Sequence, residues 1–397
     1  MISTYRRVLG QPGALAFTVS GLIGRLPIAM VGLGIVLLVS TRTGSYSLAG
    51  SVSASYLIAN GLFAIVLSRW VDRFGQHRVL PAAIAGFGLG LAMLMTAVWL
   101  RWPEPAPHVF AVVAGVCNPQ IGACVRARWS YLLGDRQLLQ TAFAFEAVAD
   151  EMVFMVGPTL VVFLSTGVHP LAGLAATIAL GVGGTAALVV QRRTEPPPSR
   201  TTAGGSGPIG WSILGPLAAC ALAMGVLFGG TEVATVAFAD EHHHKSLAGV
   251  MLAVWSLGSL LAGLVTGSMR MSVSSRTRFR WGLLALTLLM LPLPFVRAFP
   301  VLAGVFFLAG FAVSPTLIAS IAWVEETVPP SRLTEGITVV TTGLGAGVAV
   351  GALVVGVVVD RAGASTSYWV PFVAGGCGVV IAFVTAAVTR GHRVILP

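Results

Sequence analysis

The sequence predicts an all-α membrane protein with about twelve transmembrane helices, because the chain is apolar overall and long apolar runs recur along it. Of its 397 residues, 56% are hydrophobic and 10% are charged, and the mean hydropathy is +0.88. Soluble domains carry about 25% charged residues, so most of this surface cannot face water. A bilayer core of roughly 30 Å needs about 20 apolar residues per helix, and runs of that length follow one another to the end of the chain.

Twelve segments meet this length and polarity requirement, and one stretch between them differs in composition. The apolar segments are approximately residues 14–39, 48–68, 79–100, 107–128, 139–165, 168–190, 211–238, 246–268, 280–297, 300–324, 333–359 and 367–389. Residues 191–210 are rich in Pro, Gly, Ser and Thr, and three successive prolines forbid a helix there. We therefore expect a six-helix bundle over 1–190, a cytoplasmic linker over 191–210 and a second six-helix bundle over 211–397.

The basic residues predict how the chain is oriented in the membrane. Of the 24 Lys and Arg residues, eighteen fall on the side of the N-terminus, five fall in the alternate loops, and Arg25 lies inside the first span. Cytoplasmic loops carry the excess of Lys and Arg, so both termini are expected in the cytoplasm. The net charge of +10 is spread over short loops, which argues against a nucleic-acid partner. The four cysteines all lie in apolar runs without metal-ligand spacing, so no metal site is expected.

The loop after the second span carries the most specific motif. It reads Ser68-Arg-Trp-Val-Asp72-Arg73-Phe-Gly75-Gln-His-Arg78. This loop resembles the signature loop of the major facilitator superfamily, G-x-x-x-D-R-x-G-R-[RK], with Asp72, Arg73 and Gly75 in their places. Arg78 supplies the basic residue one place later than usual, and Ser68 replaces the first glycine. Together with the two six-helix halves and their linker, the resemblance covers essentially the whole chain.

The physical role expected of this loop is that of a gate at the membrane face. Gly75 permits the tight turn, and Asp72 at a helix end can pair with Arg126 or Arg128 on a neighbouring helix. The resemblance implies that such a pair holds one access state and breaks in the other. The alternative is a plain surface turn with basic residues beside it. A similar spacing ends in Asp360 after the eleventh span, where we expect a helix terminus with a turn or, alternatively, a conformational lock.

Charged residues inside the spans are the candidate substrate or proton sites. Glu146, Asp150 and Glu151 lie in the fifth span, where each charge costs about 2.5–3.5 kcal/mol near the bilayer centre. Glu146 and Asp150 are four residues apart and so share one helical face. Arg25, in the first span, cannot deprotonate and must be paired or solvated. Because the first and fifth spans are neighbours in the superfamily, we expect Arg25 to pair with Asp150 or Glu151. The carboxylates then either carry a proton or serve as structural partners.

Two further features of the spans bear on function. Glu232, in the seventh span among small residues, is a substrate or proton site or a carboxylate that extends toward the outer surface. Gly157-Pro158 in the fifth span resembles the core of the antiporter motif, in which the pair kinks the helix. The glycines that end that motif are replaced here by Val161 and Val162. An ordinary proline kink is the alternative interpretation.

Polar and small residues elsewhere in the spans are expected to hold helices together. Asn60, Asn118 and Gln120 are amides in the second and fourth spans, where such groups more often join helices than contact substrate. The glycine-rich segment 343–356 in the eleventh span suggests a close approach of another helix.

The resemblance implies a secondary transporter that works by alternating access, and not an enzyme. It needs no cofactor, because the proton gradient would drive transport through the membrane carboxylates. Our leading expectation is a proton-coupled efflux carrier for amphipathic small molecules or drugs. It would be a monomer in contact with membrane lipids, in the cytoplasmic membrane of a bacterium. The Arg-rich, Lys-poor composition suggests an actinobacterial-type member. The alternatives are an uptake permease for a small organic acid, with Arg25 as anion anchor, and a non-transporting sensor or lipid flippase-like protein.

Overall fold

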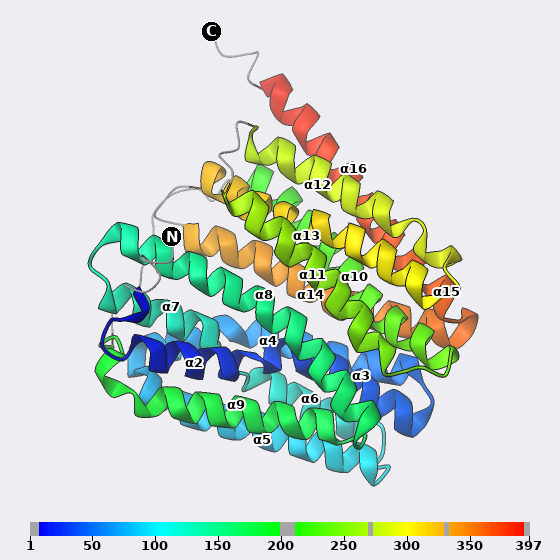
Figure 1. Cartoon of the computed structure of the whole chain (residues 1–397), viewed down its shortest axis with the longest axis horizontal. Helices are drawn as coiled ribbons and strands as arrows, with labels where there is room; N and C mark the ends of the chain where they lie inside the picture. The colour runs from blue at the N-terminus through cyan, green and yellow to red at the C-terminus, as the bar shows by residue number, and fades with distance from the viewer. Residues whose placement is uncertain (1–7, 199–210, 269–272, 329–332, 393–397) are drawn as a thin grey trace. The chain divides into compact units, whose positions relative to one another are not determined.

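The computed structural model describes residues 8–198, 211–268, 273–328 and 333–392, and all regular structure within these ranges is helical (Figure 1). Twelve segments in the described part are long and apolar enough to cross a membrane, which confirms the predicted number of spans. Several spans are longer than the apolar segments expected from the sequence, whereas the sixth, Ala172–Val190, is shorter. The second, for example, covers Tyr46–Phe74, because polar and charged residues at both ends continue the helix.

The helices of the first half occur in chain order as α2 (Ala14–Arg25), α3 (Pro27–Thr43), α4 (Tyr46–Phe74), α5 (Gln76–Trp99), α6 (Pro105–Val116), α7 (Ile121–Leu132), α8 (Arg136–Gly167), α9 (Ala172–Val190) and η1 (Arg192–Thr194). They are followed by α10 (Trp211–Glu241), α11 (Leu247–Ser268), α12 (Ser275–Met290), η2 (Leu293–Phe295), α13 (Phe299–Thr327), α14 (Leu333–Ala362), α15 (Ala364–Ser367) and α16 (Trp369–His392).

The chain folds as two compact units. Unit 1 consists of Met1–Gly44 with Ser55–Thr201, and unit 2 consists of Ser45–Ala54 with Thr202–Pro397. The start of α4 therefore packs with unit 2, whereas the rest of α4 belongs to unit 1. The change from one unit to the other after Thr201 falls within the expected linker, of which residues 199–210 lie outside the described part.

The first span is interrupted at the residue that carries its charge. Helix α2 ends at Arg25, Leu26 forms a turn, and Pro27 is the first residue of α3. Proline has no backbone N–H to donate, so it fits the first turn of a helix but not its interior. The interruption places Arg25 at a helix end inside the apolar part of the protein, where its side chain is only 5% exposed.

The fourth span is also divided, which the sequence did not predict. Residues 117–120 separate α6 from α7, and Pro119 lies in this break. The side-chain amides of Asn118 and Gln120 donate to Oδ1 of Asn60 in α4, at 3.2 and 3.1 Å. These bonds join the break to the second span, as expected for polar residues that hold helices together.

Unit 1 packs around aromatic and aliphatic side chains near the start of α2. The fully buried Phe17 meets the ring of Trp129 edge-on at 4.6 Å, with Val125 and Leu188 in the same cluster. Helix α2 lies beside α9, and α3 lies beside α8 and α9 (Figure 1). This arrangement brings the first, fourth, fifth and sixth spans together around the charged residues.

Unit 2 is built around α10, which packs against α14 and α16 (Figure 1). Side chains at Gly347 and Gly351 of α14 would collide with the backbone of α10, which confirms the close approach expected for the segment 343–356. In contrast, a Cβ at Gly345 would meet no described atom within 4 Å. The core of this unit includes Phe279 and Trp323, whose ring centroids are 5.6 Å apart.

Candidate functional site

The charged residues of the first and fifth spans form one buried cluster in unit 1. Nη1 of Arg25 lies 2.7 Å from Oδ1 of Asp150, and Nη2 of Arg25 forms a short ion pair with Oε2 of Glu146. The remaining nitrogen, Nε, donates to the carbonyl oxygen of Gly21 at 3.2 Å. The expected pairing of Arg25 with Asp150 is therefore present, and Glu146 is a second partner. Because Glu146 and Asp150 are one turn apart on α8, both carboxylates reach the same guanidinium.

Helix α7 completes the cluster with two more donors. Nη2 of Arg126 lies 2.6 Å from Oδ2 of Asp150, and the indole Nε1 of Trp129 donates to Oε1 of Glu146 at 2.8 Å. Gly122 lies beside this arrangement, since a Cβ there would come within 3.3–3.4 Å of the Arg25 and Arg126 side chains. A small residue at this position leaves room for the two arginines.

The two carboxylates of the cluster differ in their access to the surroundings. Glu146 is completely buried, whereas Asp150 is 32% exposed and its partner Arg126 is 38% exposed. The positive and negative charges of the cluster balance, because these ion pairs join two guanidinium groups to two carboxylates. Asp150 is therefore the more accessible carboxylate of the cluster, and Glu146 is the enclosed counter-charge of Arg25.

The other predicted residues of the fifth span lie nearby. Glu151 is half-buried on α8, and the carboxylates that pair with Arg25 are those of Glu146 and Asp150. Pro158 lies within α8, which continues to Gly167. A Cβ at Gly157 would come within 2.8 Å of Cβ of Ala29, so Gly157 marks a close contact between α8 and α3.

The signature loop forms the expected turn but not the expected ion pair. Gly75 joins α4 to α5 with φ of 91°, a conformation that favours glycine, and its N–H donates to Val71 at 2.8 Å. Asp72, Arg73 and Arg78 are all exposed at the ends of these helices. Within the described residues, no ion pair links Asp72 to Arg126 or Arg128. The structure gives both arginines other partners.

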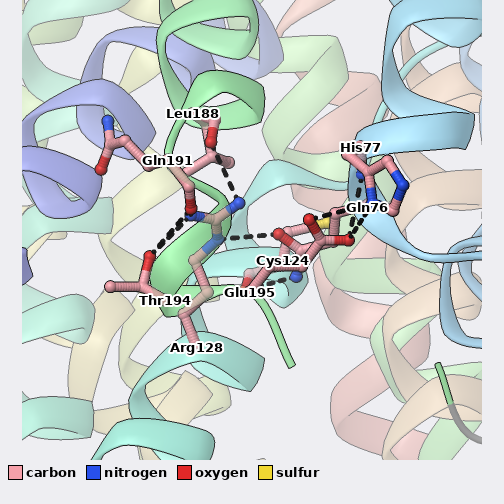
Figure 2. Close-up of polar contacts among 8 residues, drawn as sticks. All are labelled: Gln76, His77, Cys124, Arg128, Leu188, Gln191, Thr194 and Glu195. Atoms are coloured by element: carbon pink, nitrogen blue, oxygen red, sulfur yellow. Dashed lines mark hydrogen bonds and ion pairs between the residues drawn. The ribbon is translucent and has the colours of Figure 1, made fainter. Parts of the chain in front are cut away.

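Arg128 instead binds the end of the sixth span and is completely buried (Figure 2). Its Nε donates to Oε1 of Gln76 at 2.8 Å, and Nη2 donates to the carbonyl oxygen of Leu188 at 3.0 Å. Its Nη1 donates to the carbonyl oxygen of Gln191 at 2.7 Å and to Oγ1 of Thr194 at 2.8 Å. The guanidinium thus adds donors to carbonyl groups at the C-terminal end of α9, where the helix no longer supplies the N–H groups of a following turn.

The segment that follows α9 contacts the signature loop through the side chain of Glu195. Oε1 of Glu195 accepts a bond from the backbone N–H of His77 at 3.1 Å and lies 2.9 Å from His77 Nδ1 (Figure 2). Glu195 is 7% exposed, and its negative charge lies at the N-terminus of α5, where the helix dipole favours it. The beginning of the expected linker is therefore an ordered part of unit 1. Sequence reasoning missed this contact, although Glu195 is the only acidic residue in 191–198.

In unit 2, Asp360 at the end of α14 binds the beginning of α4. Its carboxylate accepts bonds from the backbone N–H groups of Tyr46 at 2.8 Å and Ser47 at 2.7 Å, and from Oγ of Ser45 at 2.9 Å. These bonds satisfy donors in the first turn of α4, so Asp360 acts as a helix cap supplied by another helix. Glu232, the candidate charge of this unit, is half-buried in α10.

Twelve apolar spans, together with paired charges buried inside unit 1, define a multi-pass membrane protein with features of a transporter. The sequence matches the model of the Major Facilitator Superfamily in two overlapping stretches, residues 15–296 and 217–394. The chain therefore belongs to the Major Facilitator Superfamily. A search of curated protein sequences found no match.

Solved structures of transporters share this fold over nearly the whole chain. The POT family transporter PepTSo is 13% identical with a TM-score of 0.68, covering 96% of this chain and 98% of its own. The nucleoside transporter NupG is 16% identical with a TM-score of 0.68, covering 94% and 98%. The human organic anion transporter MFSD10 (TETRAN) is 16% identical with a TM-score of 0.65, covering 94% and 99%. The family and the fold point to a transporter and not to an enzyme.

Proposed function

We propose that the protein is a secondary transporter that works by alternating access and exports amphipathic small molecules in exchange for protons. The observation that carries this proposal is the cluster of Arg25, Glu146, Asp150 and Arg126 inside unit 1. Ionisable residues within membrane spans are costly, and their retention marks pathways for protons or substrates.

The cluster suits proton coupling because its two carboxylates are held differently. Asp150 joins Arg25 to Arg126 and is partly exposed, so a proton that reaches Asp150 removes the charge that holds both arginines. Neither guanidinium can release a proton in compensation, and Arg126 then loses the one ionic partner that it has among the described residues. Protonation is thereby linked to a rearrangement of α7 against α8. In this scheme Asp150 carries the proton, and Glu146 holds Arg25 in place.

The same geometry weighs against uptake of an organic acid anchored by Arg25. All three nitrogens of Arg25 already have partners, in Glu146, Asp150 and the carbonyl of Gly21. An anionic substrate would have to displace a carboxylate from it. Export is favoured by Gly157-Pro158 in α8, since this pair resembles the core of the antiporter motif. With the excess of Arg on one face, we place both termini in the cytoplasm and the protein in a bacterial cytoplasmic membrane.

The proposal is tested with purified protein in liposomes that contain a fluorescent pH indicator. Ethidium, an amphipathic cation, is added on one side, and counterflow of protons is followed together with ethidium movement. We expect coupled fluxes from the wild type and their loss in Asp150→Asn, which keeps the shape of the side chain and removes its charge. Glu326→Gln, a matched change at an exposed residue at the end of α13, should transport normally.

Three results would contradict the proposal in different ways. Full coupled flux in Asp150→Asn would remove Asp150 as the proton carrier. Ethidium movement that is unaffected when a protonophore collapses the gradient would exclude proton coupling. Proton-linked entry of lactate, with no movement of ethidium, would favour the organic-acid permease.

A further inference from the structure

In the described part of unit 2, Glu232 is a carboxylate within a membrane span that no side chain neutralises. Within the described residues, the Glu232 carboxylate has neither a hydrogen bond nor an ion pair, although it is half-buried inside the span Leu214–Glu241. In unit 1, by comparison, Glu146 and Asp150 each have two charged or polar donors. An unpaired charge at membrane depth is expensive, so its position calls for a partner from outside the chain.

The face of α10 that bears Glu232 also leads to a cavity. Leu217, Ala221, Met224, Phe228 and Glu232 follow one another at spacings of three or four residues, so they form one stripe along the helix. The first three of these residues line the cavity. Met224 and Glu232 are two turns apart, which at 1.5 Å per residue corresponds to about 12 Å along the axis.

The cavity is suited to an apolar group. Its volume is about 180 Å³, and its walls come from α10, α12, α13 and α14, with Phe279, Leu317 and Leu344 among the lining residues. Its polar side chains are already occupied, because the Ser320 and Thr341 hydroxyls donate to backbone carbonyls at 2.7 and 3.0 Å. An apolar protein cavity of about 150 Å³ can bind benzene, so this one has room for a single aromatic ring.

Aromatic side chains lie between the cavity and the carboxylate. Phe228, one turn before Glu232, meets Trp255 edge-on at 5.7 Å, and Trp255 stacks on Phe306 at 5.5 Å. Trp255 is only 8% exposed, so little water reaches its ring. Aromatic faces attract organic cations when water is excluded.

We infer that unit 2 contains a binding site for a monovalent amphipathic organic cation. Glu232 holds the charged head, Phe228 and Trp255 border it, and the cavity beside Met224 receives an apolar ring about 12 Å away along the helix axis. This inference rests on the proposed transport of amphipathic molecules and specifies their charge and shape. It also assigns different tasks to the two units, with proton carriage at Asp150 in unit 1 and cation binding at Glu232 in unit 2.

The test is equilibrium binding to the purified full chain by titration calorimetry, without any gradient. The probe is phenylhexyl-trimethylammonium, a cationic head joined by a flexible chain to one ring. Phenylheptanoate, of similar length with a negative head, and tetramethylammonium, which lacks the ring, serve as comparison ligands. The wild type should bind the long cation and not the anion.

Three substitutions separate the parts of the site. Glu232→Gln should weaken binding of the long cation by about tenfold or more, because the charge-assisted contact is lost. Ala221→Leu fills part of the cavity, so it should lower the binding affinity for the long cation and leave the affinity for tetramethylammonium unchanged. Phe228→Leu removes only the aromatic face and should lower the binding affinity for both cations by a few-fold. This variant keeps the test decisive if Glu232→Gln fails to fold. Glu326→Gln is the matched control.

The result is independent of the proton-coupling proposal, because Asp150→Asn should bind the cation like the wild type. Normal cation binding without coupled transport would sustain this site and overturn the proposed function. Binding of the long cation by Glu232→Gln within twofold of the wild type, or equal binding of phenylheptanoate by the wild type, would overturn the site itself.

Discussion

The Glu146→Gln substitution tests whether the cluster in unit 1 is held by its buried charge. The glutamine side chain oxygen can still accept the bond from Trp129, so the change mainly removes one negative charge. Two guanidinium groups, those of Arg25 and Arg126, would then share the single carboxylate of Asp150. We expect the free energy of unfolding to fall, because Arg25 is buried and keeps its charge.

The magnitude follows from the burial of the two pairs. Glu146 is 0% and Arg25 is 5% exposed, and breaking a buried pair by removing one partner costs about 3–5 kcal/mol. Asp150 and Arg126 are 32% and 38% exposed, so solvent screens their pair, and exposed pairs are worth about 0.2–1 kcal/mol. Asp150→Asn also weakens a contact to Arg25, yet its cost should remain well below that of Glu146→Gln.

The measurement is unfolding of the purified protein by sodium dodecyl sulfate in mixed micelles, followed by circular dichroism. The double variant Arg25→Gln with Glu146→Gln restores electrical balance, since Asp150 then faces Arg126 alone. It should be more stable than Glu146→Gln by at least about 1 kcal/mol. Equal stability of Glu146→Gln and Asp150→Asn would refute the electrostatic explanation. So would a double variant whose loss of stability equals the sum of the losses in Arg25→Gln alone and Glu146→Gln alone.

Two more predictions concern helix contacts. Arg128→Met removes the guanidinium that donates to the carbonyl groups of Leu188 and Gln191, so the segment after α9 should detach and trypsin should cleave faster at Arg192 and Arg193. Unchanged cleavage there, relative to the exposed Arg73, would show that Arg128 does not hold this segment. Gly347→Ala places a methyl group against the Leu222 carbonyl and should destabilise the protein by about 1–3 kcal/mol in the same unfolding assay. Gly345→Ala is the control, because its methyl group meets no described atom within 4 Å, and it should be neutral or stabilising.

Features that depend on local composition could be predicted from the sequence. Hydropathy alone specifies the twelve spans, because an apolar run of about 20 residues has few stable alternatives to a membrane helix. Gly75 was predictable because a tight turn between α4 and α5 favours a positive φ. The pairing of Arg25 with Asp150 was also predictable, since opposite charges inside apolar spans need each other.

Features that depend on the rotation and depth of each helix were decided only by the tertiary structure. The sequence spacing places Glu146 and Asp150 on one face, but the packing of α7 and α8 makes Glu146 enclosed and leaves Asp150 partly open. Arg128 was one of two candidate partners of Asp72, yet it binds backbone carbonyls at the end of α9, and no sequence motif marks such acceptors. Among the described residues Glu232 has no partner for the same reason, because which side chains face a carboxylate is set by neighbouring helices far away in the chain.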